Sequence, residues 1–168
     1  MDGPSHSGHL VLLHFGRTRV ALAQRAVRSL EAAVDADYSV AAPGALGAIV
    51  VAGASWPVYA LDEELKPLHN VPRERRICAL LAGEHGSFGV LCDEAQVLAR
   101  QNLSAYPLPV AMRRKGSALE GVLNIGTGVA VLSSARGLAF AVGVAEVTKA
   151  GADELQSEPL SEPQSEPQ

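Results

Sequence analysis

Five histidines and two clusters of acidic residues are the side chains in this sequence that could support acid–base or metal chemistry. Such chemistry needs a nucleophile beside a base, two carboxylates in one cleft, or a group of metal ligands. His9 and His14 are five residues apart on an expected strand, so they face opposite sides of it. His69 and His85 have no acidic or cysteine neighbour at a ligand spacing. We therefore expect no metal site at these histidines.

The acidic clusters, residues 62–64 and 93–94, stand at expected strand ends, where neighbouring carboxylates are usually solvated. An enzyme that uses Asp93 and Glu94 is an alternative, and turnover that persists after Asp93→Ala would exclude it. The glycine-rich stretch 121–128 lacks the Lys-Ser/Thr ending of a phosphate-binding loop, and its glycine spacing does not fit a dinucleotide fingerprint. The sequence therefore predicts a tight hairpin there, no catalytic residue and no cofactor.

Two short basic runs, residues 73–76 and 113–115, are expected in solvated turns, with a patch for an acidic partner as the alternative. The formal net charge is -4, and three acids belong to a repeat near the end of the chain, so the remaining body is close to -1. Such a body lacks the basic field that phosphate binding needs, which argues against a nucleic-acid partner.

Composition points to one domain outside the membrane. The chain has 168 residues, of which 48% are hydrophobic, enough for a single buried core. Cys78 and Cys92 each lie inside an apolar run, which is typical of buried thiols rather than disulfides. The first apolar run, residues 10–13, is too short for a signal segment or a membrane span. We expect a cytoplasmic protein with no direct membrane insertion.

Both ends of the sequence are expected to be flexible. Residues 1–8 are rich in Gly, Ser and His, and residues 146–168 contain the unit Ser-Glu-Pro three times. That repeat carries one apolar side chain, Leu160, and cannot bury enough surface to offset the entropy of ordering it. Proline at every fourth residue also prevents a continuous helix. We expect a disordered acidic tail, with tethering of a partner as the alternative role.

Between these ends, short apolar runs alternate with glycine-containing turns, which is typical of meandering β structure that closes into barrels. Short helices are expected at 62–68 and at 134–140, the second capped by Ser133 or Ser134. Apolar spacings of four, three and four favour a helix at 22–34. Four hairpins are predicted, pairing residues 10–15 with 20–22, 46–51 with 56–61, 77–81 with 88–92, and 119–125 with 129–132.

The second of these hairpins resembles the central signature of CheW-like domains. In that family a glycine opens a strand, an Arg-Gly pair makes the turn, and Pro-Val or Pro-Ile begins the next strand. Residues 15–22, 27–30, 89–93 and 119–138 resemble further family segments in the same order, so the similarity covers about residues 9–142. The signature positions that match without a gap are Gly47, Gly53, Pro57, Val58 and Leu61.

The resemblance implies a mainly β fold over residues 9–145, with two small five-stranded β-barrel subdomains that share a hydrophobic core and one or two short helices. It also implies that residues 25–31 are extended, and we follow it over the helical spacing because strand pairing often overrides local propensity. Gly53 would then occupy a turn position that favours positive φ, and Pro57 a strand start or edge.

CheW-like proteins are non-enzymatic adaptors, and the resemblance implies the same role here. The chain would couple chemoreceptors to a CheA-type histidine kinase in a bacterial chemosensory pathway, for chemotaxis or for control of type IV pili and twitching motility. Its partners would be the regulatory domain of the kinase and the cytoplasmic tip of the chemoreceptor, with no cofactor. The alternative is a sensory β domain of the same fold that binds a small molecule in a closed apolar pocket.

The departures from the family pattern fall on polar positions. Ala52 stands in place of the signature arginine, and a charge-assisted hydrogen bond from that arginine would contribute about 1.5–3 kcal/mol. Trp56, the single tryptophan, is either an interface anchor or a core residue. Ser29 replaces an acid, with Glu31 two residues on, and Asp62 replaces an arginine. The resemblance thus implies a partner-binding set of Ser29, Glu31, Ala52, Gly53, Trp56 and Asp62.

Overall fold

The computed structural model describes residues 8–40, 42–84, 86–99 and 103–144. The expected flexible ends, 1–8 and 146–168, lie outside these residues except for Gly8. In this described part of the chain, one α-helix, α1 (Ala135–Val142), and three short 3₁₀ turns, Gln24–Ala26, Ala33–Asp35 and Val110–Met112, accompany the strands. The strands are β1 (Leu10–Phe15), β2 (Thr18–Ala23), β3 (Val27–Ala32), β4 (Gly47–Val51), β5 (Ala54–Ala60), β6 (Ile77–Gly83), β7 (Gly86–Cys92), β8 (Glu94–Leu98), β9 (Ser104–Pro107), β10 (Gly121–Asn124) and β11 (Val129–Leu132).

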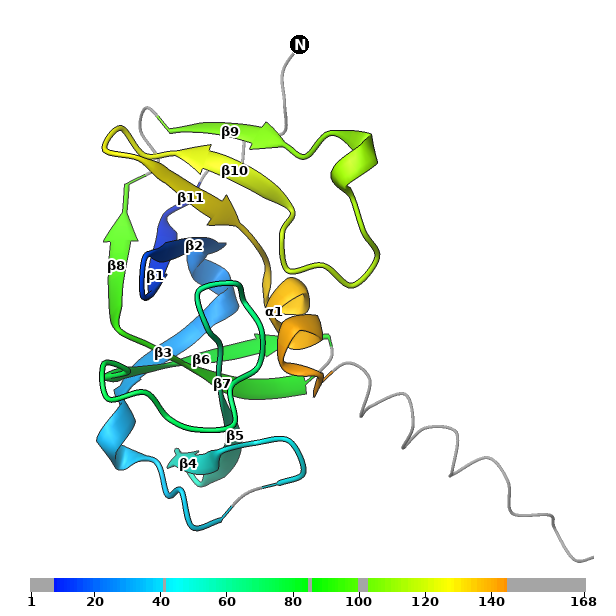
Figure 1. Ribbon diagram of the computed structural model, residues 1–168. Coiled ribbons are helices and arrows are strands. Elements are labelled where there is room, and N and C mark those ends of the chain that lie inside the picture. Colours follow the sequence, from blue (N-terminus) through cyan, green and yellow to red (C-terminus); the bar gives the residue numbers. More distant parts are fainter. Residues whose placement is uncertain (1–7, 41, 85, 100–102, 145–168) are drawn as a thin grey trace, which may run out of the picture.

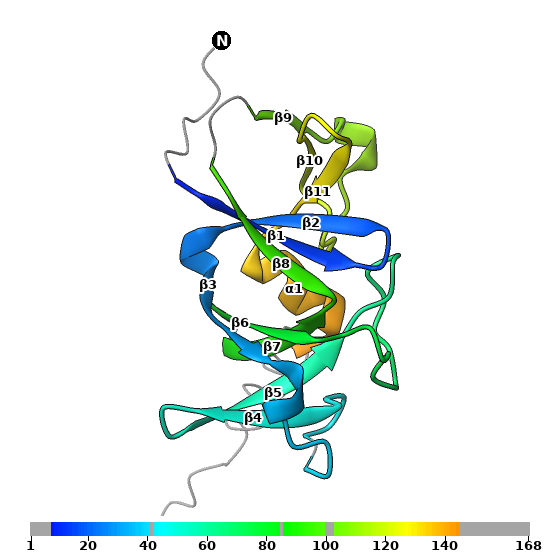
Figure 2. The same ribbon diagram turned by 90° about the vertical axis from the view of Figure 1, so that its left-hand side faces the viewer.

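The strands form two sheets that lie one above the other (Figures 1 and 2). The first sheet has six strands in the order β8-β1-β2-β11-β10-β9, and the second has five in the order β3-β6-β7-β5-β4. Neighbouring strands are antiparallel except for β2 with β11 and β5 with β7. Helix α1 lies beside the junction of the two sheets (Figure 1). This confirms the expected mainly β fold, in which the four predicted hairpins pair as β1–β2, β4–β5, β6–β7 and β10–β11.

Three apolar clusters hold this arrangement together. The largest lies between the sheets and includes Phe15 of the first sheet, Phe88 of the second and Leu138 of α1, so both sheets share one core. Because side chains alternate along a strand, the outward faces of the same strands fill two further clusters. One, within the second sheet, includes Ile49 and Leu80. The other, within the first sheet, is smaller: Leu10, Leu12, Ala21, Leu123 and Ala130.

The segment with helical spacing is a strand. From Ser29 to Ala32 of β3, half-buried residues alternate with exposed ones, which is the period of a strand that covers one side of a core. Two of the residues that would have formed a buried helical stripe are exposed instead, Leu30 at 43% and Val34 at 87%. Pairing of β3 with β6 outweighs the local helix propensity, as the family resemblance implied.

The helix expected at 62–68 is absent, and that prediction is wrong. Asp62 Oδ1 accepts hydrogen bonds from the backbone N–H of Glu64 at 2.8 Å and of Lys66 at 2.9 Å, so the carboxylate closes a turn. Leu65 has a φ of +60° and packs against the shared core. The helix expected at 134–140 is confirmed as α1, because Ser134 Oγ accepts from Gly137 N at 3.0 Å and Gly143 ends it with a φ of +82°.

Two strands were not predicted, and the described sheets differ in strand number and closure from the two five-stranded barrels that were expected. β8 and β9 form the outer edges of the first sheet, which therefore has six strands rather than five. Among the described residues, the edge strands of each sheet do not pair with each other, although a bridge between Asp37 and Ala48 joins the segment after β3 to β4. No helix in the described part of the chain is long and apolar enough to cross a bilayer.

Candidate functional site

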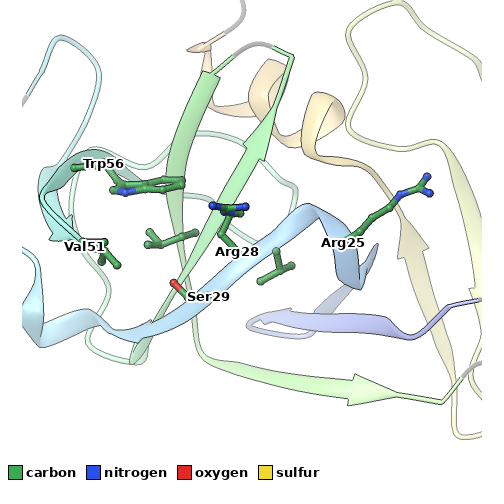
Figure 3. A pocket seen from close by; sticks show the side chains of 9 residues that line it. Arg25, Arg28, Ser29, Val51 and Trp56 are labelled. Atoms are coloured by element: carbon green, nitrogen blue, oxygen red, sulfur yellow. The ribbon is translucent and has the colours of Figure 1, made fainter.

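An open hollow of about 490 Å³ lies on the second sheet, where the start of β3 approaches the β4–β5 hairpin (Figure 3). The two walls come from segments that are about 25 residues apart in the sequence, and β6 contributes the apolar residue Leu80. The lining residues are Arg25, Val27, Arg28, Ser29, Val51, Ala52, Ala54, Trp56 and Leu80.

A β-bulge shapes the wall formed by β3. Val27 pairs with Leu81 and Ser29 pairs with Leu80, so Arg28 is an extra residue in the ladder. A bulge of this kind bends the strand and changes the direction of a side chain. Consequently three consecutive residues, Val27, Arg28 and Ser29, all line the hollow, whereas a regular strand would turn the middle one away.

The opposite wall is the tip of the β4–β5 hairpin. Ala52 and Gly53 form a two-residue turn between the paired residues Val51 and Ala54, and their φ values are +51° and +79°. Positive φ at both central residues is the pattern of a type I′ turn, whose twist matches that of the flanking strands. A glycine adopts this conformation freely, whereas the alanine is strained there. The expected positive φ at Gly53 is confirmed.

The hollow combines positive charge with an aromatic surface. Arg25 and Arg28 form no ion pair with any described residue, so both guanidinium groups are available to a ligand. Trp56 is half-buried and packs against the cluster within the second sheet, while it also lines the hollow. Its Nε1 is buried and has no acceptor among the described residues. In Figure 3, Arg28 lies between Trp56 and Arg25. Such a surface suits an acidic segment that also carries apolar groups.

The structure brings some of the expected partner-binding residues together. Ser29, Ala52 and Trp56 line the hollow, and Gly53 forms the adjoining turn. Glu31 lies two residues beyond Ser29 on the same face of β3, near Cys78. Asp62 does not reach the hollow, because it lies beyond the opposite end of β5 and closes the turn described above.

Arg25 and Arg28 were not singled out from the sequence. They lie inside the segment 22–34, whose spacing favours a helix, and their three-residue spacing alone does not place them on one wall. That placement depends on the 3₁₀ turn Gln24–Ala26 and on the bulge, neither of which has a local sequence signal. The hint available from the sequence was the extended segment 25–31 implied by the family resemblance, together with the single tryptophan.

A second polar cluster joins the two sheets, and it corrects two expectations. The Arg75 side chain is 6% exposed and donates from Nη1 to Asp93 Oδ1 and from Nη2 to the Leu61 carbonyl oxygen at 2.8 Å. Asp93 Oδ2 accepts from Gly16 N at 2.7 Å. Arg75 is therefore not in a solvated turn, and Asp93 is not a solvated strand end. Because the Arg75 guanidinium and the Asp93 carboxylate compensate each other's charge, this ion pair has a structural role.

The exposed loop beside this pair is tied to the β1–β2 turn. Glu63 accepts from Arg17 N at 3.0 Å through Oε1, and its backbone oxygen accepts from the Thr18 hydroxyl at 2.5 Å. The hydrogen bond from the Arg17 N–H, followed by that from the Arg17 side chain, lowers the pKa of the Glu63 carboxyl. Glu63 thus acts as an acceptor that holds two loops together.

The thiols are poorly suited to nucleophilic chemistry. Cys78 and Cys92 are free and buried, and burial raises the pKa of each thiol to about 12. No group of three His, Cys, Asp or Glu side chains in the described ranges is arranged to hold a metal ion. His85 lies outside the described residues. Residues 121–128 form β10 and the glycine turn of the expected hairpin, and β11 is its second strand.

The fold is mainly β and of the CheW type, because two sheets share one core and helix α1 lies beside them. Among solved structures, the chain is similar to the scaffolding protein TtCheW from Thermoanaerobacter tengcongensis, with a TM-score of 0.59 and 16% sequence identity. The match covers 76% of this chain and 88% of that chain. No protein-family model and no curated protein matches the sequence.

Proposed function

We propose that this chain is a non-enzymatic adaptor that docks a partner protein at the hollow between β3 and the β4–β5 hairpin. One observation carries the proposal. Three positions that the family resemblance marked as contacts, Ser29, Ala52 and Trp56, come from two separate segments and meet at one hollow. The fold on which they meet is shared with a scaffolding protein.

The proposed partners are the regulatory domain of a CheA-type histidine kinase and the cytoplasmic tip of a chemoreceptor, in a bacterial chemosensory pathway. We assign the hollow to the kinase domain. Arg25 and Arg28 supply the positive charge that Ala52, in place of the family arginine, lacks. The partner surface should therefore carry carboxylates beside an apolar group that packs on Trp56. This role places the chain in the cytoplasm and gives it a part in chemotaxis or in the control of type IV pili.

Titration of the full chain with the kinase regulatory domain and the receptor tip encoded beside it tests the proposal. The variant Arg25→Glu/Arg28→Glu should weaken kinase binding by about tenfold or more, because reversed charges repel a complementary surface. The matched control Arg73→Glu/Arg76→Glu makes the same charge change at exposed residues that do not line the hollow. If the folded protein binds neither partner, the proposal is wrong.

The alternative, a small-molecule sensor, gains less support from the geometry. It requires a closed apolar pocket with a few convergent polar groups. The hollow is open and bears two arginines, and the faces within the sheets are occupied by packed side chains such as Leu12 and Leu80. Ligand-dependent stabilisation of the full chain in a thermal-shift screen would favour this alternative over the adaptor.

A further inference from the structure

The chain contains a segment whose chemistry matches the hollow. Residues 145–168 hold one basic and six acidic side chains, whereas residues 1–144 hold 13 basic and 12 acidic ones. Within this acidic part, Ser-Glu-Pro recurs at 157–159, 161–163 and 165–167. Regularly spaced proline favours the polyproline II conformation, which aromatic-lined grooves recognise at a small entropic cost.

We propose that the Ser-Glu-Pro repeat of this chain docks into its own hollow. The repeat carboxylates pair with Arg25 and Arg28, and a proline ring packs on the face of Trp56. In the view of Figure 3, an extended segment that crosses the hollow passes the indole, then Arg28, then Arg25. Because the proposed function assigns the same hollow to a partner, the repeat then acts as an internal competitor that lowers partner affinity.

The length of the intervening chain permits this contact. Eleven residues lie between Val144, the last described residue, and Gln156, and in polyproline II form the twelve steps from Val144 to Gln156 span roughly 37 Å. A domain of this size is roughly 35–40 Å across, so the tether lets the repeat reach a large part of its surface. A tether of this length gives an effective concentration on the order of millimolar, which makes even a weak contact substantially populated.

The tryptophan, rather than charge alone, makes the contact selective for this surface, because Arg73 and Arg76 also form no ion pair with a described residue. Arg17 and Arg75 already have carboxylate partners, Glu63 and Asp93. Arg25 and Arg28 have none among the described residues and stand beside the only tryptophan. Each exposed charge pair contributes modestly, so the proposed contact is reversible and sensitive to salt.

The single tryptophan makes the test direct, because its fluorescence reports only on the hollow. Acrylamide quenching of Trp56 is compared in the full wild-type chain and in the full-length variant Glu158→Gln/Glu162→Gln/Glu166→Gln. If the repeat covers the indole, quenching is weaker in the wild type, and removing the three charges lowers the docking constant by roughly five- to tenfold. Arg25→Gln/Arg28→Gln should give the same increase in quenching, and the control Arg73→Gln/Arg76→Gln should give none.

Equal quenching in the wild type and the Glu→Gln variant, at low salt and with both proteins folded, overturns the proposal. A wild-type effect that grows with protein concentration also overturns it, because the repeat would then occupy a second copy. No partner is present in this measurement, so it succeeds or fails independently of the adaptor role. If both hold, the Glu→Gln variant binds the kinase domain about fivefold more tightly than the wild type does.

Discussion

Removal of the Asp93 carboxylate should strongly destabilise the protein, because it leaves a buried guanidinium without its counter-charge. In Asp93→Ala the Arg75 guanidinium keeps its place, 6% exposed and 5.7 Å from the centre of the Phe15 ring, but loses its counter-charge. At an effective dielectric of about 20, a pair at contact distance is worth about 4 kcal/mol. A buried charge left without its partner costs about 3–5 kcal/mol.

The two partners are not equivalent, which sharpens the prediction. The Asp93 side chain is 23% exposed and retains the Gly16 N–H as a donor, so Arg75→Met leaves a carboxylate that water can partly solvate. Arg75→Met should therefore cost less than Asp93→Ala, and the double variant should be more stable than Asp93→Ala alone. Urea unfolding at pH 7 measures the free energy of unfolding of the two single variants and of the double variant. This reasoning would be refuted if Asp93→Ala lowered the free energy of unfolding by less than about 1 kcal/mol, or if Arg75→Met lowered it more than Asp93→Ala does.

Three further changes test the turn, the packing and the thiols. Ala52→Asn should stabilise the protein by about 0.5–1 kcal/mol, because Asn tolerates the positive φ of the turn. Gly53→Val should destabilise it by about 1–2 kcal/mol, because a β-branched residue does not tolerate that φ. Melting temperatures equal to that of the wild type would contradict the turn assignment. Gly89→Ala should lower the free energy of unfolding by about 1–3 kcal/mol, because the new Cβ would lie 2.7 Å from the Cys78 sulfur. An unchanged free energy of unfolding in calorimetry would contradict this packing. Burial raises the pKa of Cys78 and Cys92 from 9.0 to about 12, so the thiols of the unfolded chain release their protons first, and the free energy of unfolding falls as pH rises from 9 towards 12. The variant Cys78→Ala/Cys92→Ala should show a smaller decline in unfolding experiments over this pH range. An unchanged dependence of the free energy of unfolding on pH would contradict this reasoning.

Local patterns predicted the parts of the fold that local physics controls. Glycine-bounded apolar runs located the four hairpins, and the serine before residue 135 located the start of α1. β9 was missed because all four of its residues are exposed, so it has no alternation to detect. β8 was missed because it follows β7 directly and its identity depends on pairing with β1, which is distant in sequence.

The site was only partly predictable for a similar reason. The family resemblance located the hairpin turn and Ser29, because those positions lie inside spaced motifs. The bulge that turns Arg28 into the hollow follows from strand register, which a single sequence does not display. Burial of Arg75 was also hidden, because Asp93 lies 18 residues further along the chain and looked like an ordinary strand end.

The adaptor account is tested most directly by following the backbone amide resonances of the full chain during titration with the kinase regulatory domain. The account predicts saturable shifts concentrated at residues 25–29 and 51–56, the two walls of the hollow. Shifts confined to the first sheet, or a spectrum that stays unchanged at high partner concentration, would contradict it.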